Sequence, residues 1–168
     1  MTRFLLDVNV LIALIDPAHV HHGRAHNWFG SAGKRGWATC PLTENALLRI
    51  VGHPRYPNSP GNPAVVAEFL AEMRSHPGHE FWPDDASLFD DGLVDRSRLL
   101  VSSQITDAYL LALAMAHHGK FATLDRRIVA DAVIGGSEAV FSIPLSLPSF
   151  GEDSSEDEGT GTSDGGES

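Results

Sequence analysis

The stretch FLLDVNVLIALID, residues 4–16, decides the fold. Its first three residues, Phe4-Leu5-Leu6, form a short apolar run that is typical of a strand buried on both faces, as in a parallel sheet. Asp7 follows at once, and the apolar segment after it predicts a helix that stops at Asp16-Pro17. A carboxylate between a buried strand and a helix lies where open α/β sheets bind ligands, so Asp7 is the first candidate site residue.

The charge of the chain is unevenly distributed. The formal net charge of the 168 residues is −10, but the last eighteen residues hold seven acids and no base, which leaves residues 1–150 at −3. Overall acidity is therefore no argument against a nucleic-acid substrate. We expect one folded domain over residues 1–148 and a disordered, acidic, Gly/Ser-rich tail over residues 149–168.

Cysteine usage and apolar stretches indicate the compartment. The single cysteine, Cys40, excludes an internal disulfide and suits a reducing cytoplasm. Asp7 interrupts the only N-terminal segment that resembles a signal sequence. The longest apolar stretch, residues 108–116, has nine residues and is far too short for a membrane span. We expect a cytoplasmic protein that does not enter a membrane.

Strand and helix signals alternate along the rest of the chain. We expect Thr106 to cap the most apolar helix, Gly119 to end it, and a single helical turn near residues 87–89. This alternation predicts an α/β three-layer sandwich, with a central, mostly parallel sheet and helices on both faces. The expected strands after the first cover residues 36–39, 80–82, 120–124 and 139–143. After the first helix we expect one that ends near residues 30–33 and three that cover residues 41–51, 64–74 and 107–118.

Four acids are expected at one edge of this sheet. The helix from Asp107 descends eleven residues, roughly 16 Å, and the strand that follows climbs back by roughly the same distance, which returns Asp125 to the level of Asp107. Asp7 ends the first strand, and Glu44 lies in the first turn after the second. Carboxylates gathered in this way suit Mg²⁺ or Mn²⁺, and such an ion can polarise a phosphate and lower the pKa of a bound water.

Each acid also has a simpler explanation. Glu44 and Asp107 could merely complement helix dipoles, Asp125 could be a turn residue, and Asp7 could cap the helix after it. The convergence of all four on one edge favours a site over four separate coincidences.

The segments that carry these acids also carry a family resemblance. FLLDVNVLIALID, TENALLR, TDAYLLALA and FATLDRR, in this order, resemble the PIN-domain fold and, more narrowly, the VapC-type toxins of toxin–antitoxin pairs. The resemblance spans about residues 3–143. It implies a metal-dependent endoribonuclease that leaves a 3′-hydroxyl and a 5′-phosphate, with a small cognate antitoxin and a homodimer as its assemblies.

The resemblance also implies roles for individual residues. Asp7, Glu44, Asp107 and Asp125 match the catalytic acids that hold Mg²⁺, with Mn²⁺ as a substitute. Asn9 and Thr123 match polar positions that support the site. Many relatives have a further acid shortly after the last one. This chain has Arg126 and Arg127 there, which puts a complete second metal site in doubt.

Other features leave alternatives open. An aspartyl phosphatase would have a second Asp where Asn9 stands, and a domain that binds RNA without cutting would not need all four acids. His22 and His26 have the spacing of a zinc pair but lack further ligands nearby. Six bases could contact phosphates: Arg24, Lys34, Arg35, Arg49, Arg126 and Arg127. Six apolar side chains on the helices could offer a groove for the antitoxin helix: Leu11, Ile12, Leu47, Val66, Phe69 and Leu70.

Overall fold

A computed structural model describes residues 1–145, and the expected acidic tail over residues 149–168 lies outside them. The predicted α/β fold is confirmed: five strands pair in parallel in the order β3-β2-β1-β4-β5. Because the chain moves outward from β1 through β2 to β3 and then returns to the other side of β1, the order switches between β1 and β4. Ligands bind at such a switch point in open α/β sheets. The strands are β1 (Phe4–Leu6), β2 (Trp37–Thr39), β3 (His79–Phe81), β4 (Lys120–Thr123) and β5 (Val140–Ser142).

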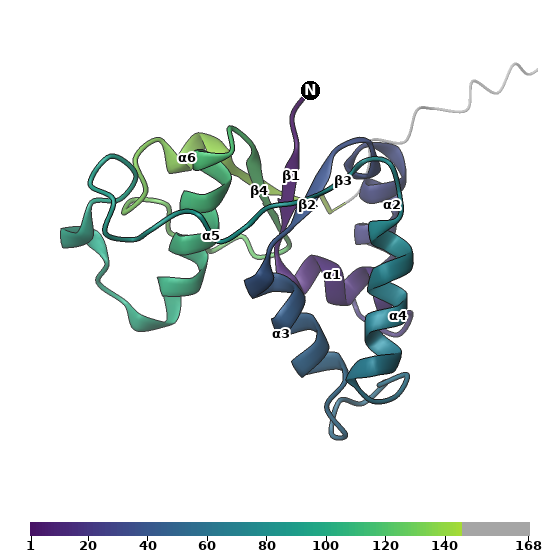
Figure 1. Cartoon of the computed structure of the whole chain (residues 1–168). Coiled ribbons are helices and arrows are strands. Elements are labelled where there is room, and N and C mark those ends of the chain that lie inside the picture. The colour runs from purple at the N-terminus through teal and green to yellow at the C-terminus, as the bar shows by residue number, and fades with distance from the viewer. Residues whose placement is uncertain (146–168) are drawn as a thin grey trace, which may run out of the picture.

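Helices cover both faces of the sheet, as predicted (Figure 1). On one face lie α1 (Val8–Ile15), α2 (His22–Ser31), α3 (Pro41–Val51) and α4 (Pro63–Arg74); on the other lie α5 (Ile105–Ala116) and the short α6 (Gly136–Ala139). Two hydrophobic cores result, and β1 contributes to both: the fully buried Leu6 packs with the α1–α4 side and the fully buried Leu5 with the α5 side. Successive side chains of this central strand point to opposite faces of the sheet, so β1 packs against both cores.

The predicted ends of α5 were wrong by one or two residues. A 3₁₀ turn over Ser102–Gln104 runs directly into the helix, so Gln104 is the N-cap and Thr106 lies inside the first turn. At the other end the last helical residue is Ala116, and His118, with φ 54°, is in the left-handed conformation one residue before Gly119. The helical turn expected at residues 87–89 is a hydrogen-bonded turn instead, and the 3₁₀ turn of this region lies at Arg96–Arg98.

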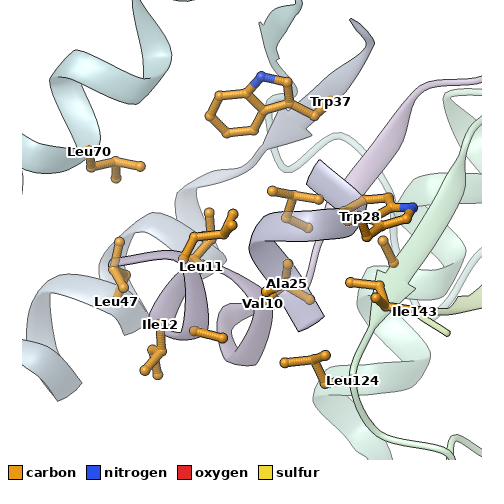
Figure 2. Packing of buried hydrophobic residues seen from close by; sticks show 14 of the residues in the cluster. Val10, Leu11, Ile12, Ala25, Trp28, Trp37, Leu47, Leu70, Leu124 and Ile143 are labelled. Carbon is orange, nitrogen blue, oxygen red and sulfur yellow. The ribbon is translucent and has the colours of Figure 1, made fainter. Parts of the chain in front are cut away.

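The apolar helix faces were expected to offer a groove, and five of those six side chains are core residues instead. Leu11, Leu47 and Val66 are fully buried, and Figure 2 shows Leu11 and Leu47 inside the packed cluster between the helices. Of the six, only Phe69 is exposed. The reason is that α1 is enclosed by α2, α3 and the sheet, so most of its circumference is needed for the core.

The His22–His26 pair belongs to the scaffold. His22 Nδ1 lies 2.7 Å from the carbonyl oxygen of Ala13, and His26 Nε2 lies 2.9 Å from that of Leu14. These are carbonyls of the last turn of α1, which have no partner within their own helix. The two imidazoles of α2 therefore cap α1.

No helix in the described part of the chain is both long enough and apolar enough to cross a membrane.

Candidate metal centre

Three of the four predicted acids lie around the switch point. Asp7 directly follows β1, Asp125 follows the neighbouring β4, and Asp107 lies in the first turn of α5. The charge of Asp107 acts on Asp7, and the charge of Asp125 acts on Asp107. The structure therefore places the three aspartates in one neighbourhood at the carboxyl edge of the sheet.

A threonine connects the two strands beneath these acids. The buried Thr123 donates its hydroxyl proton to Asp7 Oδ2 over 2.7 Å. Thr123 Oγ1 accepts the side-chain N–H of Asn9, at 3.3 Å, and the backbone N–H of Asp125, at 3.1 Å. Asn9 Oδ1 in turn accepts the N–H of Leu124. Every hydrogen-bonding position of the Thr123 hydroxyl is thus used, and Asp7 is held in one orientation relative to β4.

Burial makes the charge on Asp7 costly. Its side chain is 6% exposed, and it has no cationic partner among the described residues. Burial raises the pKa of Asp7 to about 6, with the charge of Asp107 adding to the rise and the Thr123 hydrogen bond opposing it. Burial and the charge of Asp125 also raise the pKa of Asp107. A bound cation would relieve both effects.

The fourth predicted acid, Glu44, has different partners. Its Oε1 accepts the hydroxyl of the buried Thr39 at 2.6 Å and lies 3.3 Å from Arg74 Nε, while Oε2 lies 3.4 Å from Arg74 Nη1. Arg74 comes from the last turn of α4. Glu44 is therefore in the first turn of α3, as the sequence predicts, but it is paired with a cation.

The donor set suits a divalent cation of the Mg²⁺ type, because carboxylate oxygens are the ligands that such ions prefer. In the side-chain positions of residues 1–145, however, no three His, Cys, Asp or Glu residues stand close enough together to hold an ion. Binding an ion therefore requires the carboxylates to rotate toward one another. The raised pKa values of Asp7 and Asp107 show that their ionised forms are unfavourable here, and a bound cation would stabilise those forms.

Arginines lie beside this acidic edge. The Arg24 guanidinium donates to the carbonyl oxygens of Ile143 and Pro144, just after β5. The charge of Arg126 is close enough to lower the pKa of Arg24, after the larger effect of burial. Arg127 instead pairs with Asp125, with Nε 3.6 Å from Oδ1.

The sequence reasoning missed Thr39 and Arg74. Thr39 had a signal: it ends β2 as Thr123 ends β4, and in each case the hydroxyl donates to a candidate acid. Arg74 had none, because it lies thirty residues after Glu44 and resembles any basic residue in the last turn of a helix.

Comparisons with known proteins show the family of this chain. The sequence model of the PIN domain matches residues 4–132. Ribonuclease VapC44 of Mycobacterium tuberculosis (strain ATCC 25618 / H37Rv) is 48% identical over 136 residues, which cover 81% of this chain and 95% of that protein. Ribonuclease VapC39 of the same strain is 41% identical over 131 residues, which cover 78% and 94%.

Solved structures show the same fold at low sequence identity. The structure of FitAB bound to the IR36 DNA fragment has a TM-score of 0.58 and 17% identity and covers 86% of this chain and 99% of that chain. The crystal structure of FitAcB from Neisseria gonorrhoeae has a TM-score of 0.52 and 19% identity, with 83% and 96% covered. The chain belongs to the PIN domain family. Within that family it is of the VapC type, as its identity to two VapC ribonucleases shows.

Proposed function

We propose that this protein is a Mg²⁺-dependent endoribonuclease and acts as the toxin of a toxin–antitoxin pair in the cytoplasm. The observation that carries the proposal is the buried Asp7, oriented by Thr123 and Asn9 beside two further aspartates, in a chain of the VapC type. Asp7, Asp107 and Asp125, with Glu44, would hold the ion directly or through water, and Mn²⁺ would substitute for Mg²⁺. When bound there, such an ion would supply Lewis-acid chemistry, which polarises a phosphate and lowers the pKa of a water molecule.

The protein groups around the ion have separable roles. Thr123 would fix the orientation of the Asp7 carboxylate by donating to its Oδ2. Asn9 keeps the Thr123 hydroxyl oriented, because it donates to that oxygen and is itself anchored by the N–H of Leu124. These supporting contacts reduce the reorganisation that ligand binding requires.

The test of the proposed function is cleavage of a closed circular RNA. In Mg²⁺ the protein should linearise single-stranded circular RNA, which has no ends, and the product should carry a 5′-phosphate and a 3′-hydroxyl. Gel mobility measures the opening of the circle, and sensitivity of the product to a 5′-phosphate-dependent exonuclease identifies its end. A circle that stays intact while linear RNA is degraded would show an exonuclease and overturn the assignment.

Arg24 and Arg126 would bind the RNA backbone next to the ion. The two carbonyls of residues 143 and 144 fix Arg24, and its Nη1 has no partner within residues 1–145. Arg126 follows the ligand Asp125 by one residue and has no acidic partner in that same range. Two such cations attract phosphate, and their fixed positions favour one path of the strand across the site.

The variants Arg24→Gln and Arg126→Gln should each weaken RNA binding about three- to tenfold at low salt. Each should also reduce the slope of log affinity against log salt by about 0.7, the value for one lost contact to a single strand. Fluorescence anisotropy with the cleavage-deficient Asp7→Asn background measures both quantities. Arg55→Gln, in the loop between α3 and α4, is the matched control and should keep the full slope. An unchanged slope in both site variants would remove these arginines from the RNA contact.

The antitoxin would bind at a groove other than the one the apolar pattern suggested. A hollow of about 320 Å³ lies between α1, α2 and α4 and is lined by the apolar side chains Ile15, Phe29, Phe69 and Met73. An amphipathic helix of a small partner could place its apolar side chains there.

A homodimer would use a separate surface at the start of α5, where exposed apolar residues lie close together: Leu100, Val101, Ile105 and Val129.

A further inference from the structure

Glu44 is held by residues from two separate elements, and a third element holds one of those residues in turn. Thr39 at the end of β2 donates to one of its oxygens, and Arg74 from α4 lies within 3.4 Å of both. Arg74 is also placed over the ring of Phe81, with 5.4 Å between Cζ and the ring centroid. Phe81 ends β3, so the guanidinium is held between a carboxylate and an aromatic face.

The hydroxyl of Thr39 is itself fixed. Its oxygen lies 2.8 Å from His79 Nε2, and since its only proton goes to Glu44, the imidazole must be the donor. His79 packs against Trp37, with 4.5 Å between the ring centroids. A chain of two hydrogen bonds, from His79 through Thr39 to Glu44, thus fixes the carboxylate from the side opposite to solvent.

The negative charge of Glu44 is neutralised by the adjacent guanidinium of Arg74. The acids whose charges act on one another at this edge are Asp7, Asp107 and Asp125, and Glu44 is not among the groups that raise the pKa of Asp7 or of Asp107. A carboxylate paired to a guanidinium over two contacts adds little net negative charge to a neighbouring cation site.

We propose that Arg74 and Thr39 are positioning residues that keep Glu44 away from direct ligation. Asp7, Asp107 and Asp125 then hold the ion, and Glu44 reaches it only through a water molecule. Arg74 also lowers the affinity of the site for the ion, because its positive charge offsets that of Glu44. This inference rests on the metal-dependent site proposed above.

A double-mutant cycle on Mn²⁺ binding tests this arrangement without any cleavage assay. Isothermal titration calorimetry of the full chain would measure the Mn²⁺ affinity. Arg74→Gln should tighten Mn²⁺ binding about three- to tenfold, since the site loses a positive charge. Glu44→Gln should weaken it, since Arg74 is then left without its partner. The double variant should return to within about twofold of the wild-type affinity, because the removed pair was neutral.

Two controls separate charge and position from structure. Arg74→Lys keeps the charge and should bind Mn²⁺ within about twofold of wild type, and Arg55→Gln removes an exposed guanidinium elsewhere and should do the same. A merely structural ion pair would leave Mn²⁺ affinity unchanged in Arg74→Gln, and this result would overturn the inference.

The remaining outcomes distinguish the inference from the function on which it rests. If the double variant binds Mn²⁺ at least tenfold more weakly than wild type while Asp7→Asn also loses binding, Glu44 is a direct ligand and only this inference fails. If Asp7→Asn binds Mn²⁺ as wild type does, the metal centre itself is wrong, and the inference falls with it.

Discussion

Asp7→Asn should cleave RNA at least about 10³-fold more slowly than the wild-type protein, a loss of roughly 4 kcal/mol in transition-state stabilisation. The substitution replaces a charged carboxylate by a neutral amide at the most buried of the three aspartates. The fold should be preserved, because the amide oxygen can still accept the hydroxyl of Thr123. The loss therefore reports on the metal centre and not on unfolding.

Single-turnover rates in saturating Mg²⁺ measure this effect. Asp131→Asn, which neutralises an exposed aspartate elsewhere, is the matched control and should keep the wild-type rate. Chelation should abolish wild-type cleavage, and Mn²⁺ should restore it. Wild-type rates for Asp7→Asn in Mg²⁺ would contradict the catalytic assignment.

In the ion-free protein, the contribution of Asp7 to stability should fall as the pH rises from about 4 to about 6, while His79, whose pKa burial lowers to about 4, contributes a gain over the same range. The pKa of Asp7 is raised from 3.8 to about 6 in the folded protein, so in this range the folded state binds a proton that the unfolded state releases. The stabilisation is fully present below the unfolded pKa and is lost as the pH passes through the folded pKa. A shift of about two pKa units corresponds to roughly 3 kcal/mol at neutral pH.

Thermal unfolding in a chelator between pH 4 and pH 7.5 measures this dependence. Asp7→Asn should raise the melting temperature over that of the wild type by roughly 5–10 °C at pH 7 and by less at pH 4, whereas Asp131→Asn should follow the wild type. Excess Mg²⁺ should raise the wild-type melting temperature at pH 7, because an ion bound only by the folded state stabilises it. It should not raise that of Asp7→Asn. A difference in melting temperature between Asp7→Asn and wild type that is the same at pH 4 and at pH 7 would contradict the raised pKa of Asp7.

The parts of the fold that depend on short-range patterns were predictable from the sequence. An apolar run followed by an acid indicated β1, and Pro41 and Asp16-Pro17 marked one helix start and one helix end that the structure confirms. The ends of α5 were not predictable from such patterns, because they depend on contacts with residues that are distant in the sequence. Gly119 is required for a close approach, since a Cβ there would lie 2.6 Å from Trp82 and 2.7 Å from the carbonyl oxygen of Arg3. The left-handed residue at this helix end is its neighbour His118, with φ 54°.

The placement of the acids was predictable from element lengths, and their partners were not. Rise per residue in helices and strands places an acid at the edge of the sheet without reference to anything else. The pairing of Glu44 with Arg74 joins α3 to α4, and helical periodicity carries no information about such a contact. The same limit explains the helix faces: an apolar stripe on α1 or α3 does not reveal how many neighbours will cover it.

The hydrogen bonds around Thr123 run in one direction, and this order restricts what position 9 can hold. Asn9 donates to Thr123, which donates to Asp7, and the opposite end of the Asn9 amide accepts from Leu124. An aspartate at position 9 would supply the acceptor but not the donor, and it would add a negative charge beside an acid that already resists ionisation.

An aspartyl phosphatase commonly has that second aspartate, and on this scaffold a single substitution that introduced it would disturb the hydrogen bonds of the site. Asn9→Asp would break the link to Thr123 before it could create a new nucleophile–acid pair. The amide at position 9 thus suits the metal-dependent hydrolysis of RNA and disfavours aspartyl-phosphatase chemistry on a similar sheet.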